Sequence, residues 1–173
     1  MTLRAWLLTR AYEWTEGPYA LLCRHRMSWD LSASGLLEFP RHTLGFALGA
    51  YLTHKGFELI DKREAHDLAH LLTGTDTDVV SEVALQWLLL GNGKRTLYLF
   101  LTCLAGCIVL PEHSVTFFRA YRRGCRLEVF HDWDWPRLLH GPVPVLAERN
   151  PSPAEYPHPA TRPRRFRGLV GSA

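Results

Sequence analysis

Residues 66–82 read HDLAHLLTGTDTDVVSE, a stretch that combines two histidines with several carboxylates. His66 and His70 are four residues apart, so on a helix both imidazoles project from one face. Gly74 is suited to end that helix, and the polar residues after it are suited to cap the start of a second one. Because the chain reverses between the two helices, Glu82 faces back toward the histidines. The stretch therefore predicts a helix hairpin.

The side chains on this hairpin predict a metal site. Asp67 is adjacent to His66 and rotated by about 100° around the helix. Zinc favours such sets of imidazole nitrogens and carboxylate oxygens. The flanking residues are apolar, and an unpaired carboxylate near a core would be costly. We expect His66, Asp67, His70 and Glu82 to hold Zn²⁺. The alternative is a surface histidine pair beside a solvated Asp67.

The spacing of apolar residues outside this stretch predicts further helices and no sheet. The fold class expected is all-α: one helical domain with a metal-binding helix hairpin and a flexible C-terminal tail. Seven of the eleven prolines fall between residues 142 and 163, which places the domain at 1–147 and the tail at 148–173. A loop is expected at 27–40, and the predicted helices are two short ones within 1–26, then 42–54, 56–73, 78–90, 95–109 and 111–125.

Composition narrows the function classes. The 173 residues are 47% hydrophobic and 21% charged, which excludes a disordered or collagen-like chain. The net charge of +3 resides in the tail, where five Arg stand against two acidic residues; residues 1–147 carry 15 basic and 15 acidic groups. A neutral domain argues against a nucleic-acid partner.

The longest apolar run, 97–110, is shorter than the roughly 20 residues that cross a bilayer. We interpret it as a buried helix or a membrane-surface element. Cys103 and Cys107 lie one turn apart within it and are interpreted as small buried hydrophobes. We do not expect the N-terminal stretch to be a signal peptide, since Arg4 and Arg10 interrupt its apolar residues and no small-x-small cleavage site follows.

Two further pairs of residues are candidates for binding substrate. Gly45 and Gly49 lie one helical turn apart and would let a second helix or a thin ligand approach the backbone; close helix packing is the ordinary interpretation. Arg122 and Arg123 would ordinarily mark a solvated helix face, but arginine also suits the geometry of an anionic headgroup.

The residues of the hairpin resemble a known family signature. Arg63, His66, Asp67, His70, Gly74, Thr77 and Glu82 match R-x-x-H-D-x-x-H-x3-G-x2-T-x4-E of the Coq-four family of ubiquinone (coenzyme Q) biosynthesis, in a bacterial-type form. The similarity extends upstream to FPRHTLGFALGAYL and downstream to AYRRGCRLEVFHDWDW, and covers roughly residues 36–140. The chain departs from the family at Ser81, where members usually carry glycine.

The resemblance implies a helical fold and a zinc ion held by His66, Asp67, His70 and Glu82. It implies a cytoplasmic protein, peripheral to the inner face of the cell membrane, that binds a polyprenylated hydroxybenzoate and promotes loss of its C1 carboxyl group. Asp67, if it is not a ligand, or a zinc-bound water would be the catalytic proton donor, with Gly45, Gly49, Arg63, Arg122 and Arg123 contacting substrate. Expected partners are the polyprenylated quinone precursor, the membrane surface, other quinone-biosynthesis enzymes and a second copy in a homodimer.

Two other functions stay open on the sequence. The protein can be a non-enzymatic scaffold that holds a prenyl lipid for other enzymes, with a metal that only ties the hairpin together. A weaker alternative is a metal-dependent hydrolase, although the glutamate that follows the first histidine in zinc proteases is replaced here by Asp67.

Overall fold

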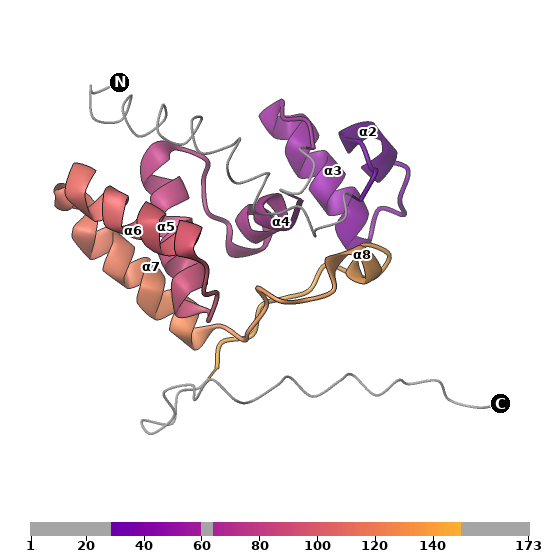
Figure 1. Ribbon diagram of the computed structural model, residues 1–173. Helices are drawn as coiled ribbons and strands as arrows, with labels where there is room; N and C mark the ends of the chain where they lie inside the picture. The colour runs from indigo at the N-terminus through magenta and orange to yellow at the C-terminus, as the bar shows by residue number, and fades with distance from the viewer. Residues whose placement is uncertain (1–28, 60–63, 150–173) are drawn as a thin grey trace.

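The computed structural model describes residues 29–59 and 64–149, and these form helices joined by short loops (Figure 1). No β-strand occurs in these two ranges, so the expected all-α class is confirmed. The elements are α2 (Ala33–Leu36), α3 (Leu44–Lys55), α4 (Glu64–Thr73), α5 (Val79–Gly91), α6 (Leu97–Val109), the 3₁₀ turn η1 (Pro111–His113), α7 (Ser114–Arg126) and α8 (Trp135–Leu138).

The structure corrects the predicted helices at two places. The expected loop 27–40 contains the short helix α2, whose first turn is capped by the Ser32 hydroxyl. The helix predicted over 56–73 does not start at Gly56, which has a φ of 70° and ends α3 in the left-handed conformation; residues 57–59 are not helical, and α4 is described from Glu64 onward. The two helices predicted within 1–26 and the tail from residue 150 onward lie outside the described residues.

Helices α5 and α7 form the closest packing in the described part of the chain. A Cβ atom on Gly124 would lie 2.0 Å from the Leu88 carbonyl oxygen, and one on Gly91 would lie 2.1 Å from the Tyr121 oxygen. The two backbones therefore touch where each helix carries a glycine. Any larger side chain at either position would push the helices apart.

The end of α5 is joined to the chain beyond α7 by one buried amide. Asn92 is 2% exposed. Its Nδ2 donates to the Glu128 carbonyl oxygen at 2.8 Å, and its Oδ1 accepts from the backbone N–H groups of Phe130 at 3.0 Å and His131 at 3.3 Å. This side chain holds the segment after α7 in place, because leaving those buried groups unpaired would be costly.

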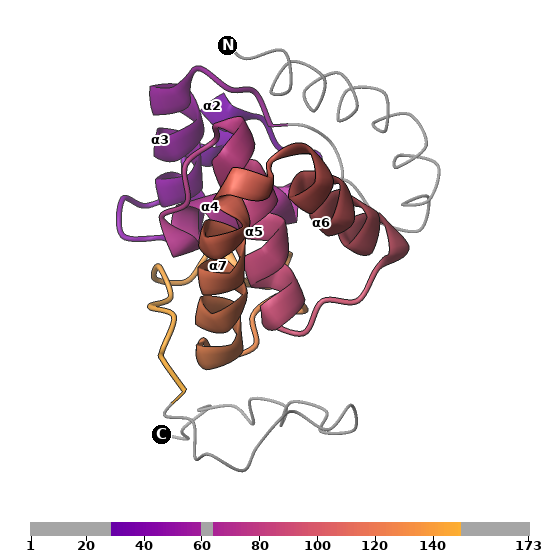
Figure 2. The ribbon, with the colours of Figure 1, turned by 90° about the vertical axis from the view of Figure 1, so that its left-hand side faces the viewer.

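Figure 1 shows α5, α6 and α7 grouped on one side, α2, α3 and α8 on the other, and α4 between them. The view in Figure 2 shows α5 between α6 and α7. The chain after α8 closes the second group, since the N–H groups of Leu44 and Gly45 at the start of α3 donate to the carbonyl oxygens of Gly141 and Leu139. An isolated bridge also pairs Leu127 with Glu148. The boundary between the helical domain and the tail, expected at residue 147, stays a prediction.

Helix α6 is buried on one side only. Leu99 and Cys103 face the core, at 1% and 3% exposed, whereas Leu97 and Ile108 are 74% and 70% exposed. Among the described helices none is by itself long and apolar enough to cross a bilayer; α6 and the segment Pro111–Arg126 pass that test together, with a bend of 107° between them.

Candidate metal centre

The loop between α4 and α5 is held closed by its own polar groups. Gly74 takes the left-handed conformation, with a φ of 63°, which ends α4. The Thr73 hydroxyl donates to the Ala69 carbonyl oxygen and lies 2.7 Å from the Thr75 hydroxyl. Asp78 then caps α5 by accepting from the N–H groups of Val80 and Ser81. The reversal that the sequence predicts is confirmed.

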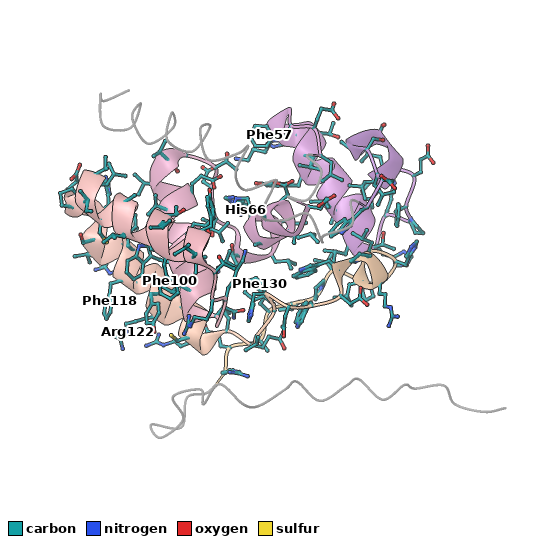
Figure 3. The ribbon with its side chains drawn as sticks, in the orientation of Figure 1. Phe57, His66, Phe100, Phe118, Arg122 and Phe130 are labelled. Carbon is teal, nitrogen blue, oxygen red and sulfur yellow. The ribbon has the colours of Figure 1, made fainter. Side chains whose placement is uncertain are left out.

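This reversal brings His66, His70 and Glu82 together. The Nε2 atoms of the two histidines lie 3.1 Å apart. The two carboxylate oxygens of Glu82 are divided between them: Oε2 lies 3.1 Å from His66 Nε2, and Oε1 lies 3.1 Å from His70 Nε2. One donor atom from each residue falls within 4.8 Å of the others. Figure 3 shows the His66 side chain in the space between α4 and α5.

The three side chains fit a divalent metal ion. Tetrahedral zinc with ligands about 2.0–2.2 Å away places its donor atoms about 3.3–3.5 Å from one another, close to the spacing seen here. His70 Nδ1 lies 3.1 Å from the Thr75 carbonyl oxygen, which can only accept. The proton of a neutral His70 is therefore on Nδ1, and the Nε2 lone pair points into the group. A His70, His66, Glu82 set suits zinc among other ions.

The electrostatics of the group follow from its burial. The side chains of His70, His66 and Glu82 are 2%, 18% and 25% exposed. Burial by itself raises the pKa of Glu82, but in the absence of a metal ion the two histidines, when their Nε2 atoms carry protons, donate to its carboxylate; these contacts outweigh burial and lower that pKa to about 2. Burial lowers the pKa of His66, which favours a neutral imidazole, whereas at His70 burial is outweighed by the hydrogen bond and charge of Glu82, which raise the pKa, so a cation would displace a proton there. The group therefore presents one negative carboxylate and nitrogen donors to a cation.

Asp67 is not part of this group of three. It lies one residue from His66 on α4, is half-buried, and acts electrostatically on both His70 and Tyr51. It is thus close to the centre without offering a donor atom to the converging set. Its assignments as fourth ligand and as proton donor stay predictions.

The three arginines predicted to contact substrate differ in their surroundings. Arg123 Nη2 donates to the Thr73 carbonyl oxygen at 2.8 Å, so this residue of α7 caps the C-terminal end of α4. Arg122 is exposed and extends outward from α7 beside Phe118 (Figure 3). Arg63 lies outside the described residues. A substrate role for any of the three stays a prediction, and Arg123 has in addition a structural contact to the hairpin.

Gly45 and Gly49 are packed against protein. A Cβ on Gly49 would lie 2.8 Å from Leu36 Cβ, and one on Gly45 would lie 2.6 Å from the Phe39 ring. The close approach of α2 and Phe39 therefore explains why both positions are glycine. This agrees with close helix packing, the ordinary interpretation of two glycines one helical turn apart. Their contact with substrate stays a prediction.

A cleft of about 840 Å³ lies at the start of α4, and Phe39 forms part of its wall. Neither histidine of the centre nor Glu82 lines it. The residues that line it are mostly aromatic and apolar, with three carboxylates among them: Trp29, Leu31, Phe39, Glu64, Ala65, His131, Asp132, Trp133, Asp134, Trp135, Pro136, Leu139 and His140. Gly45 affects this cleft indirectly, because it leaves room for the Phe39 ring.

The sequence pattern misses one contributor to the centre, the Thr75 carbonyl, and the electrostatic effect of the hairpin carboxylates on Tyr51. The Thr75 carbonyl orients His70, but the stretch around Thr75 indicates only helix-capping residues. The position of Thr75 directly after Gly74, which ends α4, is the one feature of the sequence that could have indicated this role. Tyr51 carries no such signal. It is on α3, and only the packing of α3 against α4 brings it near the hairpin.

No protein-family model and no curated protein matches this chain. Among solved structures, the crystal structure of a putative ubiquinone biosynthesis protein from Nostoc punctiforme is similar, with a TM-score of 0.51 and 19% sequence identity. The similarity covers 82% of this chain and 78% of that one. At this level of identity it shows a shared fold, and a fold alone does not assign a function.

Proposed function

We propose that this chain is a zinc-dependent ubiquinone-biosynthesis protein of the Coq-four type that binds a polyprenylated hydroxybenzoate and promotes removal of its C1 carboxyl group. The convergence of His66, His70 and Glu82 carries the proposal. Support comes from the hairpin signature and from the similarity in fold to the Nostoc protein.

The proposed chemistry uses the residues in separate roles. His66, His70 and Glu82 hold the ion, and the Thr75 carbonyl keeps His70 in the tautomer that can bind it. When bound, zinc supplies a Lewis acid that stabilises negative charge on the carboxylate or phenolate oxygens of the substrate. Loss of CO2 leaves an electron pair at C1, and a proton must be delivered there. Asp67, beside the centre, is the proposed donor.

Metal content and turnover test this function together. Elemental mass spectrometry of purified protein is expected to give one zinc per chain in the wild type and none in His66→Ala or Glu82→Ala. The wild type should then release labelled CO2 from a prenylated 4-hydroxybenzoate labelled at its carboxyl carbon. Wild-type protein that takes up no metal after zinc is supplied would refute the zinc-dependent mechanism.

A specific surface favours the second function, a prenyl-lipid scaffold at a membrane. Helix α6 and the start of α7 expose a set of apolar side chains, which we call the apolar stripe: Leu97, Phe100, Leu101, Leu104, Ile108, Val115 and Phe118, all 48% to 74% exposed. Arg119, Arg122 and Arg126 are exposed on α7 beside it. Apolar groups flanked by arginines suit an interface with anionic lipid.

Vesicle sedimentation tests the scaffold function. Wild-type protein should bind vesicles that contain anionic phospholipid more strongly than neutral ones. Leu101→Glu and Leu104→Glu should each weaken this binding, whereas Val145→Glu, at a site that is 88% exposed and outside the stripe, should not. Equal binding by all four proteins would argue against the stripe. Vesicle binding without any CO2 release would favour the scaffold over the enzyme.

A further inference from the structure

Tyr51 carries a buried hydroxyl that has no hydrogen-bond partner in the part of the chain that the structure describes. The ring packs against the main hydrophobic core. A buried hydroxyl without a partner is rare, because it forfeits its hydrogen bonds to water and gains none in return. Such a group calls for an explanation, and a ligand that the hydroxyl contacts when bound is one.

The position of Tyr51 relates this hydroxyl to the metal centre. Tyr51 and Lys55 are four residues apart on α3 and therefore share a face of the helix. Lys55 Nζ lies 2.7 Å from Asp76 Oδ1, in the loop between α4 and α5. Asp76 follows Thr75, whose carbonyl oxygen orients His70. The face of α3 that carries Tyr51 is thus turned toward the loop that supports the centre.

The protonation of Tyr51 suits a hydrogen-bond donor. Burial raises the pKa of its phenol, and the charges of Asp67, Glu82 and Asp76 raise it further. The hydroxyl therefore keeps its proton throughout the neutral range. The influence of Asp67 and Glu82 also means that this hydroxyl lies within electrostatic reach of the hairpin residues around the centre.

We propose that the Tyr51 hydroxyl is a ligand-positioning donor, which hydrogen-bonds an oxygen of an anionic ligand, a carboxylate or a phenolate, held at the His66, His70 and Glu82 centre. This inference rests on the proposed function. It adds a residue from α3 to a site otherwise formed by α4 and α5. The donor would favour ligands with an acceptor oxygen over ligands of the same shape that lack one.

Cobalt-loaded protein provides a test that does not depend on turnover. The ligand probe is 4-hydroxybenzoate, and the change in the visible Co²⁺ bands measures its binding. Tyr51→Phe removes only the hydroxyl and should weaken this binding about tenfold, the effect of one lost hydrogen bond. Cobalt content should stay at the wild-type value. Tyr98→Phe, the same change on α6, should bind the probe like the wild type.

Each outcome decides a different point. Equal affinity of wild type and Tyr51→Phe would overturn the role of Tyr51 and leave the proposed function standing. Wild-type bands that do not change with 4-hydroxybenzoate would overturn the proposed ligand class and this inference with it. A tenfold loss in Tyr51→Phe, with unchanged cobalt content and melting temperature, supports the inference.

Discussion

His70 is the residue on which the centre depends most. Its side chain is 2% exposed, and it has contacts at both ring nitrogens: the Thr75 carbonyl oxygen at Nδ1, and Glu82 and His66 at Nε2. A buried imidazole with both nitrogens committed cannot rotate away from the group. Asp67, by contrast, is half-buried and stands outside the converging set.

The two residues should therefore differ in their effect on metal affinity. We expect His70→Ala to weaken zinc binding by more than about 100-fold, and Asp67→Asn by less, about 10- to 100-fold, the range of a residue that acts through a neighbouring ligand. Competition with a chromophoric chelator measures both constants. A loss in Asp67→Asn as large as that in His70→Ala would instead make Asp67 a direct ligand.

Cysteine reactivity is a second property set at single residues. Burial, with a smaller contribution from Cys107, raises the pKa of the Cys103 thiol to about 12, whereas Cys125 is exposed. The thiolate is the reactive form. Iodoacetamide at pH 8 should therefore modify Cys125 in the native protein and Cys103 only after unfolding, as peptide mass spectrometry would show. Rapid native labelling of Cys103 would contradict its burial in the α6 interface.

Helix α5 begins at a cap formed by Asp78. Because the cap is a carboxylate, the stability of this helix depends on pH. Burial opposes ionisation of Asp78, but hydrogen bonds from Ser81 and Val80 outweigh it and lower the pKa of the carboxyl below 3.8. Because the pKa of Asp78 is lower in the folded protein than in the unfolded chain, its carboxylate stabilises the fold fully at pH values above the unfolded-chain pKa. This stabilisation is lost as the pH falls through the pKa of the folded protein.

We expect Asp78→Ala to lower the free energy of unfolding by about 1 kcal/mol at pH 7. Urea denaturation at pH 7 and at pH 3 measures the difference from wild type, which should shrink at the lower pH. Asp78→Asn is the matched control, because an amide oxygen still accepts the backbone hydrogen bonds. A difference that is unchanged at pH 3 would mean that the charge contributes nothing to the cap.

The crossing of α5 and α7 depends on glycine. A methyl group on Gly124 would overlap the Leu88 carbonyl oxygen of α5, 2.0 Å from its Cβ, and neither backbone can move without disturbing the core. Gly124→Ala should destabilise the protein by about 2 kcal/mol, in the range measured for overpacked cores. At Gly141 the nearest atom to a new Cβ is 3.4 Å away, so Gly141→Ala is the control. Equal melting temperatures for the two variants would contradict the close crossing.

For the whole molecule, a metal ion bound by His66, His70 and Glu82 would join α4 to α5. Two of its ligands are on α4 and one is on α5, and α4 lies between the two groups of helices (Figure 1). Free zinc at about 1,000 times its dissociation constant should stabilise the fold by about 4 kcal/mol. That corresponds to a rise in melting temperature of roughly 10 °C or more.

Calorimetry with and without a chelator measures this rise. His70→Ala should show no shift on adding zinc, and its melting temperature should resemble that of the chelated wild type. A shift of equal size in His70→Ala would place the stabilising ion elsewhere on the protein.

Local pattern was sufficient for the hairpin because its information is local. His66, His70 and Glu82 lie within 17 residues, and the 3.6-residue period together with Gly74 and the Asp78 cap specifies which faces meet. The same rules failed at Gly56, where the helical pattern of 56–73 continued through a residue that ends α3 in the left-handed conformation. Helical periodicity alone does not locate such an end.

By itself, then, the sequence determined the all-α class, the helix hairpin and the convergence of two imidazoles with a carboxylate. Each of these follows from spacing along one short segment. Only the tertiary structure decided that Gly45 and Gly49 pack against Phe39 and α2, that Arg123 caps α4, and that the Tyr51 hydroxyl is buried without a hydrogen-bond partner among the described residues. These depend on contacts between segments up to 50 residues apart. Such contacts are set by how whole helix faces exclude water together, and no local spacing records them.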